Sequence, residues 1–356
     1  MKKKMKRSTK KVILIVLCCI LSLILAALLT GMILVNSLLN KINRPSADDP
    51  TWSPEQLESF RDVTGTGGPD TIEDPDDVVI TDGAVNPIPV GDHIINILLV
   101  GQDRRPGEPR LHSDSMILCT INKSNKTITL TSFMRDVWLR IPDPEDPFDQ
   151  RLNFAYLWGG FDLLNATLSY NFGVSADKNI EVDFNGFKKI IDYVGGVDIS
   201  LTAAEAAYLN KNGNWDAGET YDGSWTLTEG VNHLNSSQAL AYSRIRDIGG
   251  DYARTQRQRT MITALIANVK TMNISQLYSF AETALPMLTT DMDNRTILNL
   301  ITELGPMLPE MKIVSQRIPA EDAYYEAWVR GNAVLLMTDE DRIKNVQILK
   351  DTMSQY

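Results

Sequence analysis

Five arginines occur within sixteen consecutive residues of the stretch AYSRIRDIGGDYARTQRQR, in a chain whose formal net charge is -10. Guanidinium groups bind phosphate oxygens through paired hydrogen bonds, and the N-terminus of a helix adds oriented N–H donors. An extended segment, followed by a helix that begins after IGG, would bring one set of side chains together. This set comprises Arg244, Arg246, Asp251, Arg254 and Gln258. Arg257 and Arg259 point elsewhere on that helix, and for them we predict a solvated basic face. The stretch therefore predicts a site for an anion.

A second group of charged residues lies at the ends of predicted strands. Asp103 follows IINILLVG, Asp114 leads into SMILC, and Arg135 follows TITLTSFM together with Asp136. Ligands of open α/β sheets gather at strand ends, although capping a turn is the alternative role for each aspartate. Asp103, Asp114 and Asp251 offer the hard oxygen ligands that Mg²⁺ prefers beside substrate phosphates. Arginines and a carboxylate-bound metal together predict a diphosphate ligand.

The elements that position these residues alternate between strands and helices. Continuous apolar or alternating runs predict strands at 94–101, 115–122, 127–133, 180–184, 197–201 and 311–319. Helical patterns cover 160–173, 184–196, 234–269 with a break at DIGGD, 274–288, 294–304 and 339–353. The turn KSNK joins two of the strands into a hairpin, which excludes a purely parallel sheet. We predict an α/β fold with a mixed central sheet flanked by helices in αβα layers.

The N-terminal part of the chain predicts attachment to a membrane. Residues 1–11 carry seven basic groups and no acid, and the uncharged run 12–35 is long enough to cross a bilayer as a signal anchor. The positive-inside rule places the N-terminus in the cytoplasm and the remainder outside the cell. Residues 36–90 are rich in Pro, Asp and Gly and predict an extended stalk. For residues 91–356 we predict one α/β domain with a C-terminal helical extension. Because this exported part is acidic, it should repel nucleic acid.

Several motifs in the predicted domain resemble those of one protein family. NILLVGQDRRPG, HSDSMILCTIN, LTSFMRDVWLRIP, LNFAYLWGG and LNSSQALAYSRIRDIGGDYARTQRQR resemble, in order and spacing, the LytR-CpsA-Psr proteins over about residues 92–270. The resemblance implies an extracellular phosphotransferase in an envelope of the Gram-positive type. Such an enzyme moves a glycopolymer, of the teichoic acid or capsular polysaccharide type, from a polyprenyl diphosphate carrier in the bilayer onto peptidoglycan.

The resemblance also implies roles for single residues. Arg135, Arg244, Arg246, Arg254 and Gln258 match the diphosphate-binding groups of the family. Asp114 and Asp251 match its magnesium-associated acids, and Asp103 matches the acid of its first motif. We expect Asp103 or Asp114 to help deprotonate the attacking hydroxyl, with Arg135 at the reacting phosphate. The sequence departs from the family at His112, where an arginine is usual and where a neutral imidazole would bring less charge.

Two alternatives to the transferase remain open. The first is a hydrolase, in which water replaces the sugar hydroxyl at the same diphosphate. The second is a non-catalytic module that holds an anionic lipid or a wall polymer. Zinc and serine-hydrolase chemistry is disfavoured, because the sequence has no HExxH, no CxxC and no GxSxG motif.

Overall fold

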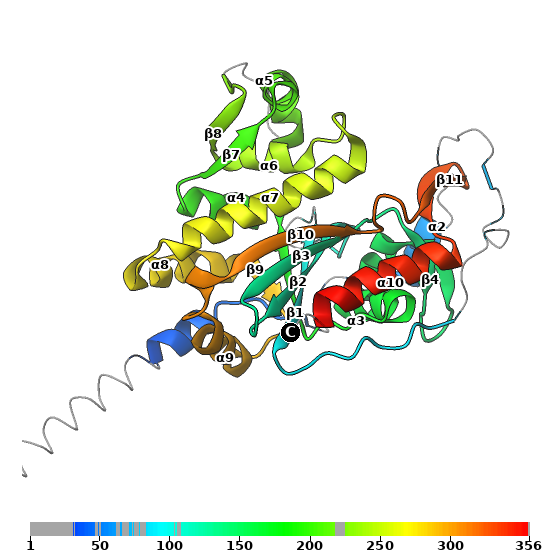
Figure 1. Cartoon of the computed structure of the whole chain (residues 1–356), viewed down its shortest axis with the longest axis horizontal. Coiled ribbons are helices and arrows are strands. Elements are labelled where there is room, and N and C mark those ends of the chain that lie inside the picture. Colours follow the sequence, from blue (N-terminus) through cyan, green and yellow to red (C-terminus); the bar gives the residue numbers. More distant parts are fainter. Residues whose placement is uncertain are drawn as a thin grey trace, which may run out of the picture.

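A mixed sheet of six strands forms the centre of the structure, which is a computed structural model (Figure 1). The structure describes residues 31, 33–46, 49, 51–61, 65, 71–72, 74, 78, 83–102, 104, 108–217 and 225–354. The strand order is β10 (Lys312–Ile318), β3 (Thr127–Phe133), β2 (Ser113–Asn122), β1 (Ile94–Gln102), β6 (Lys178–Asp183) and β9 (Leu288–Thr290). β2 is antiparallel to β1 and to β3, whereas β6 is parallel to β1 and β10 is parallel to β3. The predicted hairpin and the edge strand near the C-terminus are thereby confirmed.

Helices cover both faces of this sheet. Because side chains of a strand alternate between faces, Leu98 packs in one hydrophobic cluster with residues of α3 (Leu152–Phe172) and α10 (Asp339–Ser354). Ile97 packs on the other face with residues of α7 (Gly250–Lys270) and α9 (Asn294–Leu304). The result is the αβα layering that the sequence predicted.

A smaller lobe stands on the α7 side of the sheet (Figure 1). It contains α4 (Phe184–Tyr193), α5 (Ala203–Ala217), α6 (Ser236–Arg244) and the antiparallel pair β7 (Val197–Leu201) and β8 (Gly230–Leu234). Its own apolar cluster includes Val197, Leu209, Leu234 and Ile245, all nearly inaccessible to solvent. The strand predicted at 197–201 therefore exists but pairs outside the main sheet. The structure has two further strand pairs: β4 (Trp138–Ile141) with β5 (Phe148–Arg151), and β11 (Tyr325–Val329) with β12 (Asn332–Leu336). Two more helices are α8 (Ile274–Ala284) and α2 (Pro54–Arg61).

The described parts of residues 36–90 lie against the folded domain. Leu38, Leu39 and Ile42 are buried, and the backbone of Asn43 exchanges hydrogen bonds with β9. The indole N–H of Trp52 donates to a backbone carbonyl oxygen at 2.6 Å. These parts differ from the extended stalk that we expected, because scattered apolar side chains among the Pro and Asp residues find partners on the domain surface.

The predicted anchor at 12–35 lies almost entirely outside the described residues. Within the part of the chain that the structure describes, no helix combines the length and the apolar character needed to span a bilayer.

Two local predictions were wrong. Residues 242–244 belong to helix α6 and not to an extended segment, because Asn235 and Gln238 form a capping box that starts the helix. Helix α3 begins at Leu152, eight residues before the predicted start, and passes through Gly159 and Gly160 with a kink. We had predicted that the helix begins at Gly160, but its first turns precede the two glycines.

Candidate diphosphate site

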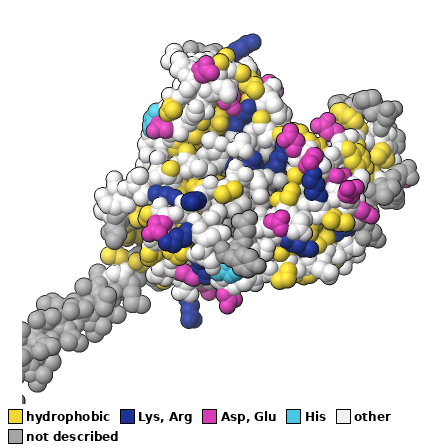
Figure 2. Space-filling view, in the orientation of Figure 1, with side chains coloured by type: hydrophobic (Ala, Val, Ile, Leu, Met, Phe, Trp, Pro, Cys, Tyr) yellow, Lys and Arg dark blue, Asp and Glu magenta, His cyan; other side chains and the backbone are white. Residues whose placement is uncertain are grey.

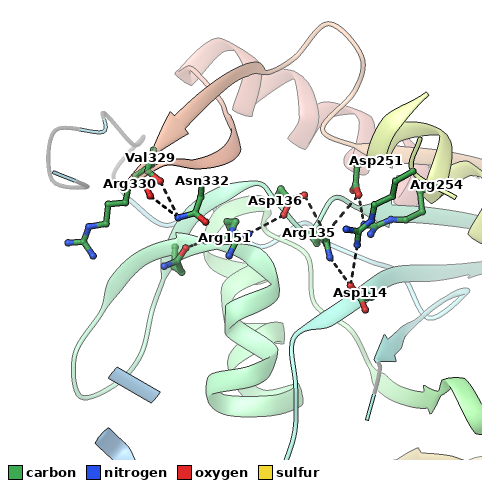
Figure 3. Close-up of polar contacts among 11 residues, drawn as sticks. Asp114, Arg135, Asp136, Arg151, Asp251, Arg254, Val329, Arg330 and Asn332 are labelled. Carbon is green, nitrogen blue, oxygen red and sulfur yellow. Dashed lines mark hydrogen bonds and ion pairs between the residues drawn. The ribbon is translucent and has the colours of Figure 1, made fainter. Parts of the chain in front are cut away.

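Arg135 is the centre of a network of charged side chains at the ends of β2 and β3 (Figure 3). Its Nη1 donates to Asp114 Oδ1 at 2.7 Å, and its Nε lies 3.4 Å from Asp136 Oδ2. Its Nε also lies 3.9 Å from Asp251 Oδ1, which belongs to α7. Residues that are distant in sequence therefore meet at the strand ends, as the sequence predicted.

Helix α7 and the segment before it contribute two more arginines. Arg254 Nη2 lies 2.6 Å from Asp251 Oδ1, one helical turn away. Arg246 Nη2 lies 3.7 Å from Asp114 Oδ1, so Arg246 joins the network at the other aspartate. Gly249 and Gly250 have φ of +76° and +64°, which lets the chain turn sharply into α7. Arg246 and Arg254, which flank this turn, thus reach two different aspartates of the network.

Burial and neighbouring charges shift the pKa values of the side chains in this network. Arg254 is only 2% exposed, and burial lowers its pKa to about 10, although it is still cationic at neutral pH. Burial likewise raises the pKa of Asp251 above its ordinary value, even though Arg254 opposes the shift. Burial acts to lower the pKa of Arg135, but the three aspartates together raise it. Arg151 also belongs to the network, because its Nη1 lies within 4 Å of Asp136. The four arginines exceed the three aspartates by one formal positive charge, so a bound anion would meet an excess of cations.

The network borders an apolar cavity of about 490 Å³ between the sheet and the lobe. Asp114, Arg244, Arg246, Arg254 and Gln258 line one part of it. The remaining lining is mainly apolar and includes Phe187 and Ile190 of α4, Leu240 of α6, and Met261, Ile262 and Leu265 of α7. The segment 261–269 of α7 therefore contributes to this cavity. The apolar segment 161–172 of α3 instead supplies core residues such as Leu164 and Phe172.

Arg244 and Gln258 therefore lie in the same cavity as the network. The Arg244 guanidinium carbon lies 4.7 Å from the centre of the Phe184 ring, a cation–π contact. Gln258 Oε1 and Arg254 Nε are both buried and have no hydrogen-bond partner among the described residues. Buried polar atoms without partners are uncommon. Both residues line the cavity, so a ligand bound there could form the missing hydrogen bonds. The structure thus brings together all the predicted site residues that it describes; Asp103 lies outside the described residues.

Arg151 is a site residue that the sequence reasoning missed. A smaller cavity of about 310 Å³ is lined by Leu111, His112, Asp114, Arg135, Arg151 and Asn153. Because Asp114 lines both cavities, this one opens at the same network. Burial lowers the pKa of His112 to about 4, so its imidazole is neutral at pH 7 as expected. Arg151 Nη1, 3.7 Å from Asp136 Oδ1, supplies the positive charge there. Its only signal in the sequence is a single basic residue before LNFAYLWGG.

The prediction of a solvated face for Arg257 and Arg259 was wrong. Arg257 is 4% exposed, and its Nε donates to Glu205 Oε1 at 2.7 Å. Its other nitrogens donate to the backbone carbonyls of Ile245 and Ile248. Arg259 is 3% exposed and donates to Gln256. Helix α7 is covered by the sheet and by the lobe at once, so few of its positions remain for solvated charges.

The acids of the network fit a divalent cation in part. Asp251 Oδ2 is buried and accepts no hydrogen bond from any residue that the structure describes, so it could bind a cation. Asp114 and Asp251 both contact Arg135, which keeps their carboxylates in one region. Among the described residues, no three His, Cys, Asp or Glu side chains are grouped as in a complete metal site.

Acidic and basic side chains are mixed on the face of the molecule shown in Figure 2. They lie beside one another over much of the half that carries α10. The network follows the same pattern, since each of its arginines has an aspartate within 4 Å. The guanidiniums of the network could nevertheless select an anion by their geometry, because paired hydrogen bonds to phosphate oxygens need no broad positive patch.

Comparison with known proteins agrees with the motifs. The LytR_cpsA_psr family model matches residues 73–351. The chain belongs to the LytR-CpsA-Psr family. This match includes the whole six-stranded sheet and every residue of the charged network.

Relatives within the LytR-CpsA-Psr family include named transferases. The polyisoprenyl-teichoic acid–peptidoglycan teichoic acid transferase TagU of Bacillus mycoides is 35% identical over 190 residues, which are 53% of this chain and 56% of the relative. The corresponding transferase TagV of Bacillus subtilis is 32% identical over 195 residues, 53% of this chain and 47% of the relative. The chain thus spans about half the length of the curated relatives it matches.

Solved structures of the LytR-CpsA-Psr family share the fold. The crystal structure of TagV from B. subtilis has a TM-score of 0.58 and 26% identity, and the match covers 75% of this chain and 99% of that chain. The family protein YwtF (TagT) with bound octaprenyl pyrophosphate lipid has a TM-score of 0.55 and 20% identity, with 77% and 98% covered.

Proposed function

We propose that this protein transfers a glycopolymer, of the teichoic acid or capsular polysaccharide type, from a polyprenyl diphosphate carrier onto peptidoglycan. The observation that carries the proposal is the arginine and aspartate network at one end of an apolar cavity. A polyprenyl diphosphate has the same two parts, a compact dianionic or trianionic head and a long apolar tail. Homologues named as teichoic acid transferases, and TagT with its octaprenyl pyrophosphate, support the same ligand class.

The proposed reaction is an in-line displacement at phosphorus. The sugar hydroxyl oxygen of the acceptor attacks the phosphorus that carries the glycopolymer, and a phosphodiester forms. The bond from this phosphorus to the bridging oxygen breaks, and polyprenyl phosphate leaves with that oxygen. Such a reaction needs charge neutralisation and positioning more than a protein nucleophile. Arg135, Arg246 and Arg254 would hold the phosphate oxygens, while Asp114 or Asp103 would accept the proton of the hydroxyl.

We also propose that Mg²⁺ takes part. Asp114 and Asp251, together with Asp103, would hold it, and the ion would neutralise phosphate charge when bound. The unpartnered Asp251 Oδ2 supports this proposal. Removal of divalent ions with EDTA should reduce the transfer rate at least tenfold, and added Mg²⁺ should restore it. An unchanged transfer rate in EDTA would show that the reaction does not need Mg²⁺.

We place the protein in the cell membrane, with one span near the N-terminus and the domain outside the cell. The basic residues before the apolar run and the acidic domain support this orientation. Protease added to intact protoplasts should digest the domain but leave the basic N-terminal tail. Protection of the domain in intact protoplasts would contradict the orientation.

A transfer assay with the full chain in lipid nanodiscs tests the proposed function. The donor is a polyprenyl diphosphate with a radiolabelled glycopolymer, and it is incubated with and without peptidoglycan. We expect label on peptidoglycan and release of polyprenyl phosphate that depends on the acceptor. Release at equal rates in both reactions, without attachment, would identify a hydrolase.

The same assay distinguishes an enzyme from a binding module. Asp114→Asn and Asp251→Asn should each lower the transfer rate by roughly a hundredfold, in the range found when a catalytic electrostatic group is removed. Complementation in cells adds the second half of this test. If both variants kept full function in cells while Arg254→Ala lost it, a non-catalytic module that binds an anionic ligand would be the correct description.

A further inference from the structure

A second, larger cavity adjoins the apolar one. Its volume is about 1370 Å³, and charged or polar side chains make up much of its lining. Asp183, the last residue of β6, lines both cavities. Arg135, Arg246 and Arg254 are not among the described residues that line this larger cavity.

The two cavities lie on opposite faces of β6. Ile180 and Val182 line the apolar cavity, whereas Glu181 lines the polar one, because successive side chains of a strand point to opposite faces. Only at the carboxyl end of the strand does one residue, Asp183, reach both. Molecules bound in the two cavities would therefore come together at the strand end.

A buried donor and acceptor pair forms part of the wall of the polar cavity. Tyr156 of α3 donates its hydroxyl hydrogen to Glu181 Oε2, and these residues are 2% and 6% exposed. Burial, supported by the carboxylate of Glu181, raises the pKa of Tyr156 well above its ordinary value, so the phenol stays protonated. The Arg110 guanidinium carbon lies 5.7 Å from the centre of the Tyr156 ring. A cation, a phenol and a carboxylate are thus held together at the wall of the cavity.

The kink in α3 makes the space for Arg110. Gly159 and Gly160 leave helical geometry, and Gly160 has φ of +63°. A Cβ atom at Gly160 would overlap the guanidinium of Arg110. The glycine pair of LNFAYLWGG therefore has a structural role, which is to let a cation lie beside the polar cavity.

The rest of the lining combines cations and anions. Lys188 and Lys189 of α4 lie there together with Asp162 and Asp192. A lining of this kind suits a hydroxyl-rich chain that carries amide and carboxylate groups, because lysines donate to its oxygens and aspartates accept from its hydroxyls and amides. A polyprenyl tail, which needs apolar walls, would not bind there.

We propose that the polar cavity binds the acceptor, an N-acetylated amino-sugar strand that bears acidic peptides, and presents its hydroxyl at Asp183 to the phosphorus. This inference rests on the proposed transferase function. The first sugars of the donor have similar chemistry, so the experiment must separate donor from acceptor.

Steady-state kinetics of the full chain in nanodiscs separate these two sources. The variant is Lys188→Glu with Lys189→Glu, and the control is Lys211→Glu with Lys350→Glu, two exposed lysines outside both cavities. The acceptor is soluble, uncrosslinked peptidoglycan strands. Loss of two charge-assisted contacts should raise the KM for the acceptor at least tenfold, while the KM for the donor stays within about twofold. The control should match the wild type in both constants.

Several results of these experiments would contradict the proposal or the function on which it rests. A rise in the donor KM alone would assign the cavity to sugars of the donor and overturn the proposal. Unchanged constants for the variant would overturn it as well. If the wild type shows no transfer at all, the proposed function fails, and binding of the same strands, measured by saturation-transfer difference NMR, then tests the cavity by itself. Binding that is equal in wild type and variant would contradict the proposal.

Discussion

Single arginines of this protein have different roles although they lie close together in the sequence. Arg254 is buried beside Asp251 at the apolar cavity, whereas Arg257, one turn further along α7, is buried against Glu205 in the lobe. Residue type and spacing indicate that arginines are concentrated here. Which of them face the cavity depends on what packs around the helix.

Replacement of Arg254 tests its role toward the ligand. We expect Arg254→Ala to lower kcat/KM for the diphosphate-linked donor by roughly 10² to 10³, the usual effect of removing one donor to a developing oxyanion. Arg254→Lys should recover only part of this loss, because an ammonium does not form the paired hydrogen bonds of a guanidinium. The measurement is kcat/KM from initial transfer rates, with Arg295→Ala on the exposed side of α9 as the control. A loss of less than threefold in Arg254→Ala would exclude this arginine from the site.

Replacement of Arg257 tests a structural role instead. Arg257→Met leaves the mostly buried Glu205 without its cation, which should lower the free energy of unfolding by about 3 to 5 kcal/mol. Adding Glu205→Leu should restore much of the loss, since no charge then remains unpaired. Urea unfolding followed by circular dichroism measures both values. If the double variant lost the sum of the two single losses, the pair would not be coupled, contrary to this account.

At the scale of elements, the order of strands and helices was largely predictable. The hairpin of β2 and β3, the strand β10 and the helix α10 each follow from local pattern and turn residues. The pairing of β7 with β8 was not predictable, because strand pairing is non-local and either sheet would bury the same alternate residues.

The kink in α3 provides a prediction at this scale. Gly160→Ala should lower the free energy of unfolding by more than Gly195→Ala, which has φ of +82° but open space around its Cβ position. Both substitutions strain the backbone by about 1 to 3 kcal/mol, but only the first also displaces Arg110. Chemical denaturation of the two variants gives the comparison. Equal losses would mean that Arg110 moves aside without cost.

The pair β7 and β8 carries a pH-dependent contact. His233 Nδ1 lies 2.7 Å from Asp198 Oδ1 and its Nε2 lies 2.6 Å from the carbonyl oxygen of Gly195, and these two contacts raise the pKa of His233. The stabilisation should be complete below about pH 6.5, the unfolded value, and lost as pH rises through the higher folded pKa.

His233→Asn removes this contribution. The wild type should exceed the variant in free energy of unfolding by at most about 1 kcal/mol at pH 6, because the pair is exposed, and by less at pH 9. Unfolding curves at the two pH values give the difference. A difference that grew from pH 6 to pH 9 would reverse the sign and contradict the assignment.

At the scale of the whole molecule, one sheet separates two cavities of opposite character. The αβα layering and the meeting of Asp114, Arg135 and Asp251 could be predicted, since strand ends and a helix start converge in such folds. The cavities could not be predicted. The apolar cavity forms where α4, α6 and α7 leave space against β1 and β6, and the polar cavity lies beside α3, β6 and α4. Both therefore depend on contacts between segments far apart in the chain.

A structure of the full chain in nanodiscs with bound polyprenyl diphosphate would show directly whether the arginine network binds the head group. We expect diphosphate oxygens within hydrogen-bond distance of Arg135, Arg246 and Arg254, and the prenyl tail between α4, α6 and α7 in the apolar cavity. A diphosphate bound away from these arginines, or a tail that lies outside the cavity, would contradict this expectation.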